Sequence, residues 1–219
     1  TVTERVTLQQ TICREGTAVL TDRQNLLLQP GESRTVSFRY CVDSPALWSP
    51  ENPNLYTSTM QVLEGEEELD REETGFGIRT LSIDAAHGVR INGQTVKLRG
   101  ACIHHDNGIL GAATLPDAEE RRIRQLKEAG FNAIRSSHHP AGRALLDACI
   151  RYGVLVMDEL SDVWNVRKNP YDYALYFEQD WKPTIQKMVA KDYNHPSVIL
   201  YCVGNEISEA GSELSLIHI

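Results

Sequence analysis

The chain has 219 residues, of which 41% are hydrophobic and 24% charged, an ordinary globular composition that argues against disorder, collagen and coiled coil. Its formal net charge of −8 argues against nucleic-acid binding, because phosphate contacts need clustered Lys and Arg. No segment approaches the roughly 18 uncharged apolar residues of a membrane span. The five cysteines are scattered and odd in number, which predicts free thiols in a reducing compartment and hence a cytoplasmic protein.

Both ends of the chain indicate a piece of a longer protein. Thr1 already stands in an alternating strand pattern, with neither a Met nor a signal-peptide core before it. The last five residues, 215–219, follow the start of a helical pattern and lead nowhere. We therefore expect a fragment, and the origin of this tail stays open.

Residues 1–83 are predicted to form an N-terminally truncated, immunoglobulin-like β-sandwich. Turn signals at Gly16-Thr17 and Pro30-Gly31 separate short runs in which apolar residues recur at mostly even spacings. These apolar residues are Val2, Val6, Leu8, Val19, Leu26, Leu28, Val36, Phe38 and Tyr40.

The second part of this region combines a Pro-rich corner with a hairpin. Residues 47–56 contain two prolines and cannot form a central strand, so we expect a rigid corner with Trp48 and Tyr56 packed beneath it. Residues 57–63, a turn at Gly65 and an acidic strand ending near Thr74 predict the hairpin. Its acidic strand is interpreted as a solvated edge that discourages aggregation.

Residues 84–219 are predicted to alternate between strands and helices. Three near-continuous apolar runs, 131–136, 154–157 and 197–203, are typical of parallel strands buried on both faces, and a short pair at 88–93 and 96–99 precedes them. Amphipathic helices are expected over 117–129, over 145–150, and around 181–189. Gly130 and Gly153 end the first two, and Pro183 is placed in the first turn of the third.

The number of units favours half of a closed barrel. A (β/α)₈ barrel needs about 250 residues, whereas residues 95–219 supply 125. We therefore predict that residues 84–219 are the first half of a TIM (β/α)₈ barrel, with four strands and three helices. No GxGxxG motif follows the first strand, so a dinucleotide-binding fold loses its main support.

Ionisable or amide side chains follow each predicted strand, where parallel barrels carry their functional groups. These groups lie in residues 103–108, 135–139, 158–164 and 204–206. Adjacent His104 and His105 point to opposite faces of an extended chain, which argues against a zinc hydrolase. Asn205 and Glu206 are the sharpest signal, because a carboxylate at the end of a buried strand is partly desolvated and suits a general acid. The alternative is an ordinary helix cap.

Several motifs in order resemble glycoside hydrolase family 2, the β-galactosidase and β-glucuronidase group. The motifs are residues 47–56, Arg99-Gly100 with His104, residues 132–138, Asp158-Glu159, and residues 192–197 running into Gly204-Asn205-Glu206. The resemblance implies an immunoglobulin-like sandwich followed by a catalytic barrel. It also implies retaining hydrolysis of terminal β-galactosides by the parent protein.

The resemblance assigns roles to individual side chains. Glu206 matches the general acid/base, expected half-buried at the barrel mouth, and Asn205 matches the residue that contacts the sugar 2-hydroxyl. Further substrate-contacting positions are His104, Asp106, Arg135 and His138. The nucleophile of the family is a Glu at the end of the seventh strand, beyond residue 219. We therefore expect residues 1–219 alone to be inactive.

Departures from the family pattern narrow the prediction. Magnesium-binding β-galactosidases of the family carry Glu-Thr-His where this chain has Asp162-Val-Trp164, so no metal or other cofactor is predicted. Trp164 is interpreted as a platform for a sugar face or as core packing. Ile207 follows Glu206 where glucuronidases commonly have Pro, which favours a β-galactosidase.

Other hypotheses stay open at this stage. They are a β-glucuronidase of the same family, a non-catalytic carbohydrate-binding or interaction module, and a metal-dependent amidohydrolase. The expected partner is a small or oligosaccharide β-glycoside, with no nucleic acid and no membrane. Full-length relatives are often oligomeric, which leaves a homo-oligomeric parent open.

Overall fold

The computed structural model describes residues 3–208, so the tail at 215–219 lies outside the described residues. The chain divides into two compact units. The first consists of Thr1–Leu47 and Asn54–Ile78, and the second of Trp48–Pro53 and Arg79–Ile219. The segment Trp48–Pro53 therefore belongs to the second unit, although its position in the chain is inside the first.

The first unit contains one four-stranded antiparallel sheet among its described residues, in the order β2-β1-β3-β4. Its strands are β1 (Glu4–Arg14), β2 (Thr17–Leu28), β3 (Tyr56–Glu64) and β4 (Glu67–Phe76). Val6, Ile12 and Leu26 bury their side chains, as the period-two pattern requires. The predicted hairpin over 57–74 is confirmed as β3 and β4, whose register runs from Tyr56 opposite Phe76 to Glu64 opposite Glu67.

The predicted strand around Val36, Phe38 and Tyr40 is wrong. Residues 32–42 form no ladder with any described strand. The phenol of Tyr40 instead donates a hydrogen bond to Asp22 Oδ2 at 3.2 Å and stacks on Phe38 with ring centroids 5.9 Å apart. Alternation and β-propensity describe a side-chain pattern, and a strand forms only where a neighbouring backbone is available to pair.

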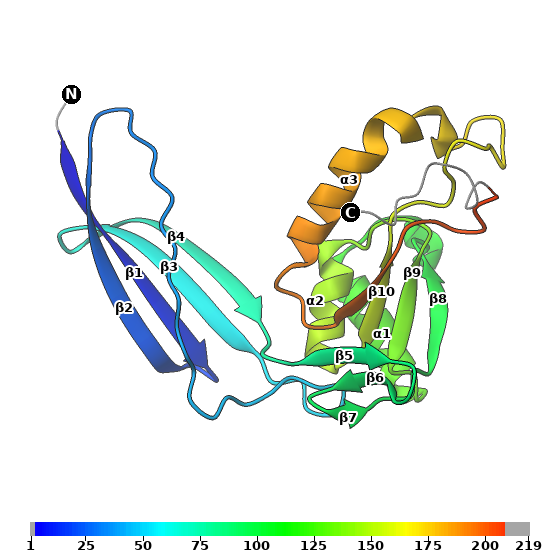
Figure 1. The fold of residues 1–219 in the computed structure, drawn as a ribbon, viewed down its shortest axis with the longest axis horizontal. Helices are drawn as coiled ribbons and strands as arrows, with labels where there is room; N and C mark the ends of the chain where they lie inside the picture. Colours follow the sequence, from blue (N-terminus) through cyan, green and yellow to red (C-terminus); the bar gives the residue numbers. More distant parts are fainter. Residues whose placement is uncertain (1–2, 209–219) are drawn as a thin grey trace. The chain divides into compact units, whose positions relative to one another are not determined.

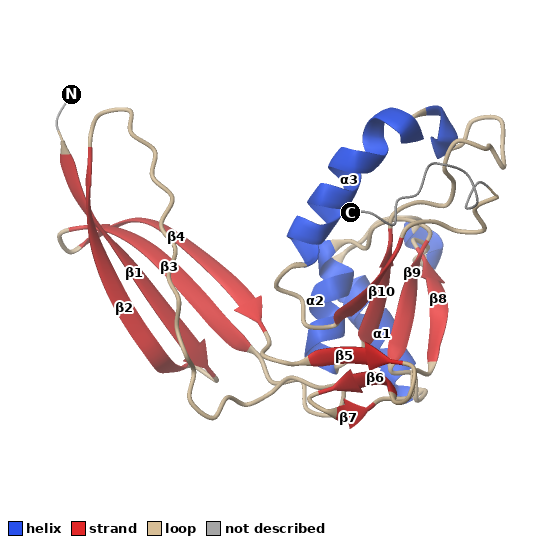
Figure 2. Cartoon of the chain, viewed as in Figure 1, coloured by secondary structure: helices blue, strands red, loops and turns tan. Residues whose placement is uncertain are grey.

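The second unit is built around a parallel sheet whose strands follow chain order, β8-β9-β10-β11, as in the wall of a barrel (Figure 1). The elements of this layer are β8 (Gly100–His104), α1 (Pro116–Glu128), β9 (Ala133–Ser137), α2 (Arg143–Tyr152), β10 (Leu155–Glu159), α3 (Phe177–Asp192) and β11 (Val198–Cys202). A smaller antiparallel sheet, β5 (Leu81–Asp84), β6 (Gly88–Ile91) and β7 (Gln94–Thr95), lies near the N-terminal ends of the parallel strands (Figure 2). The second strand of this hairpin is Gln94–Thr95 and not the predicted 96–99.

Local sequence signals explain the helix ends. Pro116 opens α1 with Asp117 and Glu119 in its first turn, where carboxylates complement the helix dipole. Gly153 ends α2 in the left-handed conformation, and its N–H bonds to Cys149 O. The placement of Pro183 was wrong, because α3 begins at Phe177 and puts this proline inside the helix. No described helix is long and apolar enough to cross a membrane.

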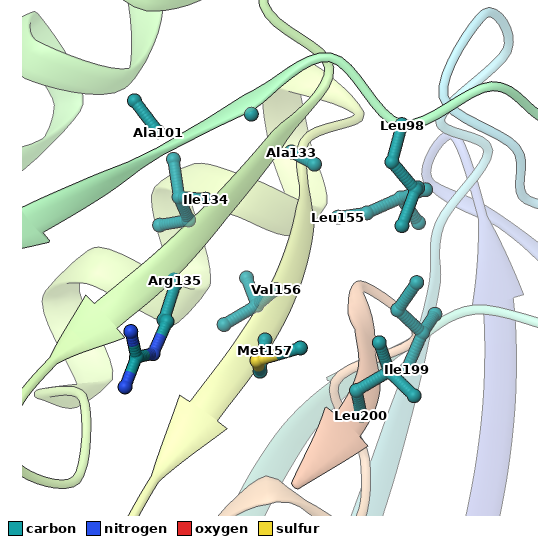
Figure 3. A pocket seen from close by; sticks show the side chains of 11 residues that line it. Leu98, Ala101, Ala133, Ile134, Arg135, Leu155, Val156, Met157, Ile199 and Leu200 are labelled. Atoms are coloured by element: carbon teal, nitrogen blue, oxygen red, sulfur yellow. The ribbon is translucent and has the colours of Figure 1, made fainter. Parts of the chain in front are cut away.

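The two faces of the parallel sheet are packed differently. The outer face forms a core with α1 and α2, in which buried side chains from both helices interlock with those of the strands. That core comprises Ile123, Ile134, Ala141, Leu145, Leu146, Ala148, Cys149, Val154, Val156 and Val198. The inner part of the sheet borders an apolar cavity of about 170 Å³, in which Arg135 is the polar member (Figure 3).

The segment Trp48–Pro53 packs against the C-terminal ends of α1 and α2 in the second unit. Trp48 is fully buried, and its indole N–H donates to Ile150 O at 2.9 Å. The ammonium of Lys127 donates to Pro50 O at 2.7 Å and to Gly153 O at 3.0 Å. The expected rigid corner is thus present. It is held by the ends of α1 and α2, which is why its backbone follows the second unit.

Candidate active site

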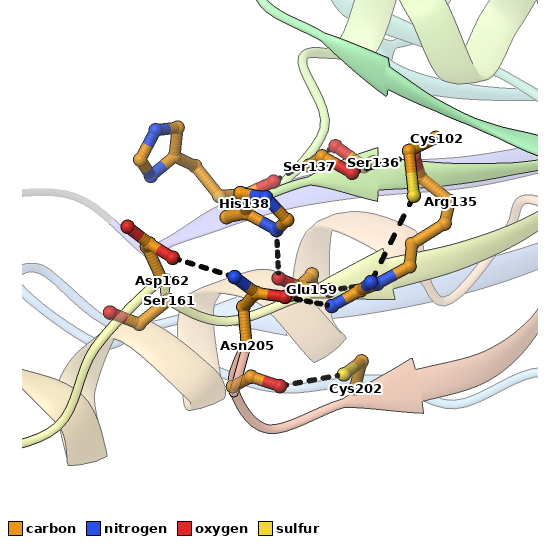
Figure 4. A network of polar contacts seen from close by, with 12 residues as sticks. Cys102, Arg135, Ser136, Ser137, His138, Glu159, Ser161, Asp162, Cys202 and Asn205 are labelled. Atoms are coloured by element: carbon orange, nitrogen blue, oxygen red, sulfur yellow. Dashed lines mark hydrogen bonds and ion pairs between the residues drawn. The ribbon is translucent and has the colours of Figure 1, made fainter. Parts of the chain in front are cut away.

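A buried carboxylate organises the C-terminal edge of the parallel sheet. Glu159, the last residue of β10, has a side chain 0% exposed. It accepts a hydrogen bond from Arg135 Nε through one oxygen, and its other oxygen lies 2.7 Å from His138 Nδ1 (Figure 4). Arg135 reaches further along this edge, which we call the rim, and its Nη2 donates to Asn205 Oδ1 at 3.1 Å. Three neighbouring strand ends are thereby joined into one polar network.

The strand alternation of β10 gives its two terminal carboxylates different environments. Glu159 faces the rim network, whereas Asp158 is buried on the opposite side of the strand, where it accepts from Ala141 N at 2.7 Å. Lys191 of α3 lies 3.4 Å from Asp158. Asp158 therefore ties β10 to the segment before α2 and to α3, and Glu159 is the member of the pair that belongs to the site.

Arg135 is held in its charged form. Although partial burial works against the charge, the hydrogen bond to Glu159 and the negative charge of that carboxylate raise the pKa of Arg135. A buried carboxylate that is fully paired by a guanidinium and an imidazole avoids the cost of an isolated charge. The pair thus gives the rim a fixed, donor-rich surface.

A second carboxylate fixes the loop that follows β11. Asp162 Oδ1 accepts from Asn205 Nδ2 at 2.9 Å and from Lys168 Nζ at 2.8 Å. Burial acts to raise the pKa of Asp162, but the hydrogen bonds from Lys168 and Asn205 outweigh it and hold that pKa below its ordinary value. Asn205 is therefore anchored through both atoms of its amide, by Arg135 and by Asp162.

Glu206 does not have the expected environment. Its side chain is 82% exposed, and Lys168 Nζ lies 3.7 Å from its carboxylate. Its backbone is in the left-handed region with φ of 50°. The described rim consists of four strands, and eight strands close a barrel. The described residues therefore cover only one side of this carboxylate. Within them, Glu206 is exposed and not half-buried as expected.

The other predicted positions lie at two separate places on the same edge. His104 contacts the site through its ring, which packs edge-on against His138 with centroids 5.1 Å apart. Asp106 instead accepts from Gly108 N at 2.9 Å and shapes the turn after β8. His105 packs against His139 at 5.6 Å, so the adjacent histidines have different partners, as their opposite orientations predict.

Trp164 is a core residue, which corrects its placement among the substrate contacts. It is 5% exposed and stacks on Phe177 with ring centroids 6.1 Å apart. Its indole N–H donates to Val203 O at 2.9 Å. The ring packs beneath the loop after β11 and so offers no face to a sugar.

Two residues of the network were not assigned from the sequence. Glu159 could have been found from the period of two in β10, which puts it on the face of Met157, whereas Lys168 stands in a polar loop without any pattern. Within the described residues, no group of three or more His, Cys, Asp or Glu side chains is arranged to hold a metal ion.

The fold and this rim define the class: a sandwich-type β unit followed by the opening strands of a β/α barrel enzyme, with a carboxylate-centred site at the strand ends. The model of the TIM barrel domain of glycosyl hydrolases family 2 matches residues 85–218, and a second model of that family matches residues 1–79. The chain belongs to glycosyl hydrolase family 2. The predicted fold class, a sandwich followed by the start of a TIM barrel, is thereby confirmed.

Individual relatives agree on the family and divide on the sugar. A β-galactosidase of Bacteroides ovatus is 41% identical over 199 residues, covering 91% of this chain and 23% of the relative. A family 2 glycosyl hydrolase structure from Bacteroides cellulosilyticus is 44% identical with a TM-score of 0.89, covering 97% of this chain and 28% of that one. A β-glucuronidase structure from Bacteroides uniformis is 31% identical with a TM-score of 0.81, covering 94% and 24%. The chain spans about a quarter of the length of these relatives.

Proposed function

We propose that the protein containing this chain is a retaining β-glycosidase of the β-galactosidase type. The observation that carries the proposal is the Glu159 network, which fixes Arg135, His138 and Asn205 along one edge of the parallel sheet. Sugars are recognised by fixed donors and acceptors, and such groups are most precise on rigid strand ends.

In this proposal each side chain has a definite task. Glu206 protonates the leaving oxygen and then takes a proton from the attacking water, while a second carboxylate about 5–5.5 Å away forms the glycosyl-enzyme. That nucleophile is provided from outside residues 1–219. Asn205 has one amide N–H engaged by Asp162, so its second N–H serves a sugar hydroxyl. Arg135 and His138 line the sugar subsite, and Glu159 orients both.

The sugar is proposed to be galactose. Ile207 directly follows Glu206, and the relative with 41% identity is named a β-galactosidase. The second candidate is a β-glucuronidase, which is supported by the Bacteroides uniformis structure of that name. A glucuronide differs from a galactoside in its C6 carboxylate and in the configuration at C4, so the two candidates demand different charges and different hydroxyl partners in the subsite.

The test uses the full-length protein and two substrates, nitrophenyl β-D-galactoside and nitrophenyl β-D-glucuronide. We expect preferential release of nitrophenol from the galactoside. Glu206→Gln should lower kcat for the galactoside by at least about 100-fold, because hydrolysis of the glycosyl-enzyme needs its general base even when the leaving group is activated. Glu178→Gln, on an exposed residue of α3, is the matched control. Preference for the glucuronide selects the second candidate, and activity retained in Glu206→Gln contradicts the mechanism.

The fragment provides an independent test. A polypeptide of residues 1–219 holds the proposed acid/base without the nucleophile, so it should hydrolyse neither substrate above its own Glu206→Gln version. Turnover by this polypeptide would place both carboxylates within it.

A further inference from the structure

We propose that Lys168 is a positioning residue for catalysis, fixing the peptide group that carries Glu206 so that its carboxyl is aimed at the leaving oxygen. The inference rests on the proposed function and adds a residue to its machinery. Lys168 lies in the loop between β10 and α3, and 37 positions separate it from Asn205 in the sequence.

All three N–H donors of the Lys168 ammonium have acceptors. Its Nζ donates to Asp162 Oδ1 at 2.8 Å, to Asp162 O at 3.1 Å and to Asn205 O at 2.9 Å. An ammonium has three N–H donors, so these three acceptors saturate it. A lysine that merely paired with one surface carboxylate would leave two donors to water, and such exposed pairs are weak.

The bond to Asn205 O acts directly on the backbone of Glu206. Asn205 O belongs to the peptide group that precedes Glu206, and Glu206 has the left-handed φ of 50°. Residues other than Gly adopt this region uncommonly and keep it where the surroundings impose it. Lys168 is the side chain that holds this carbonyl, so it selects the direction in which the Glu206 side chain leaves the backbone.

The lysine is itself placed before any substrate arrives. Asp172 Oδ2 accepts from the backbone N–H of Lys168 at 2.7 Å and from that of Asn169 at 2.9 Å. The backbone N–H bonds of Asn169 and Lys168 lower the pKa of Asp172, so this carboxylate is charged at neutral pH. The loop therefore presents Lys168 from a fixed backbone, and its side chain is 31% exposed.

Charged and titratable groups around the Asn205–Glu206 turn come from three elements. The loop after β10 contributes Asp162 and Lys168, the end of β10 contributes Glu159, and the region of β9 contributes Arg135 and His138. Of these, the ammonium of Lys168 lies 3.7 Å from the Glu206 carboxylate. The hydrogen bonds of this ammonium hold the backbone, and its positive charge attracts the Glu206 carboxylate without a fourth hydrogen bond.

The experiment separates general-acid positioning from a merely structural role by changing the leaving group. A dinitrophenolate departs without protonation, whereas an alkoxide needs the proton of a general acid. In the full-length protein, Lys168→Met should lower kcat/KM for methyl β-D-galactoside by about 10–100-fold and for dinitrophenyl β-D-galactoside by less than about threefold. Because both substrates carry the same sugar, the ratio of the two losses in kcat/KM isolates the effect of Lys168 on departure of the leaving group.

Lys187→Met, on an exposed lysine of α3, is the control and should leave both values within about twofold. Equal losses for both substrates, or no loss for either, would overturn the assignment of Lys168. Lys168→Arg keeps a positive charge in the loop, and its losses should lie between those of wild type and Lys168→Met. It also supplies the measurement if the methionine variant does not fold.

Glu206→Gln in the same assay keeps the two proposals distinguishable. A large leaving-group difference in Glu206→Gln without one in the Lys168 variants would reject the role of Lys168 and retain the acid/base. No leaving-group difference in Glu206→Gln would reject the proposed function, and with it the inference drawn from it.

Discussion

Gly153→Ala is the substitution for which the structure gives the sharpest expectation. A Cβ at residue 153 would lie 2.2 Å from Pro50 O and 2.8 Å from Pro50 C, both backbone atoms that no rotamer change can move. Gly153 also has φ of 66°, where an L-residue costs roughly 1–2 kcal/mol. Relieving the clash means displacing the Trp48–Pro53 segment from the base of the second unit.

The magnitude follows from what that displacement breaks. Lys127 Nζ would lose its 2.7 Å hydrogen bond to Pro50 O, and a hydrogen bond to a charged group contributes about 1.5–3 kcal/mol. With the backbone term, Gly153→Ala should destabilise the protein by about 2.5–5 kcal/mol, before any packing of Trp48 is lost.

Gly88→Ala is the matched control. Gly88 has φ of 68°, and a Cβ there meets nothing within 4 Å. It should therefore show the backbone cost alone, about 1–2 kcal/mol. Urea unfolding followed by tryptophan fluorescence measures both variants, since Trp48 reports on the displaced segment. Equal destabilisation of the two variants would refute the argument that the Trp48–Pro53 segment is tightly seated.

Three further predictions concern buried groups. Arg135→Met leaves the buried Glu159 carboxylate without its guanidinium partner, so thermal unfolding should show a loss of about 3–5 kcal/mol; an unchanged melting temperature would contradict the network. Burial raises the pKa of Asp192 to about 7, above its value of about 4 in an unfolded chain, so stability falls as the pH rises from about 4 to 7. Asp192→Asn removes this dependence. The melting temperature of the variant minus that of wild type should therefore be larger at pH 8 than at pH 5. Leu146→Ala, at a fully buried site between helices and sheet, should cost about 2–5 kcal/mol in urea unfolding, and a cost below about 1 kcal/mol would contradict the close packing of that core.

The elements of the second unit were largely predictable because their signals are local. Gly153 stops α2 where the apolar stripe ends, and the buried run at 154–157 becomes β10. Signals that depend on a partner were less informative. The alternation at Val36–Tyr40 produced no strand, since no neighbouring backbone pairs with it, and α3 continued upstream of Pro183 because Phe177 is anchored in a core with Trp164.

For the candidate site, the sequence identified residues better than it identified their environments. Arg135 and His138 come from the end of β9 and Asn205 follows β11, and the structure joins them through one network. Glu159 is the centre of that network. Predicting its role required knowing which face of β10 is occupied by Glu159 and which by the adjacent Asp158. The exposure of Glu206 could not be deduced, because burial at a barrel mouth depends on strands that residues 3–208 do not contain.

The route of the chain through Trp48–Pro53 has a consequence for dissecting the protein. No single cut separates the two units, because the first is interrupted by a segment that belongs to the second. A second unit excised at Arg79 would lose the indole that donates to Ile150 O and the carbonyl that accepts from Lys127. Swapping the second unit between relatives would therefore require transplanting this six-residue segment together with residues from Arg79 onward.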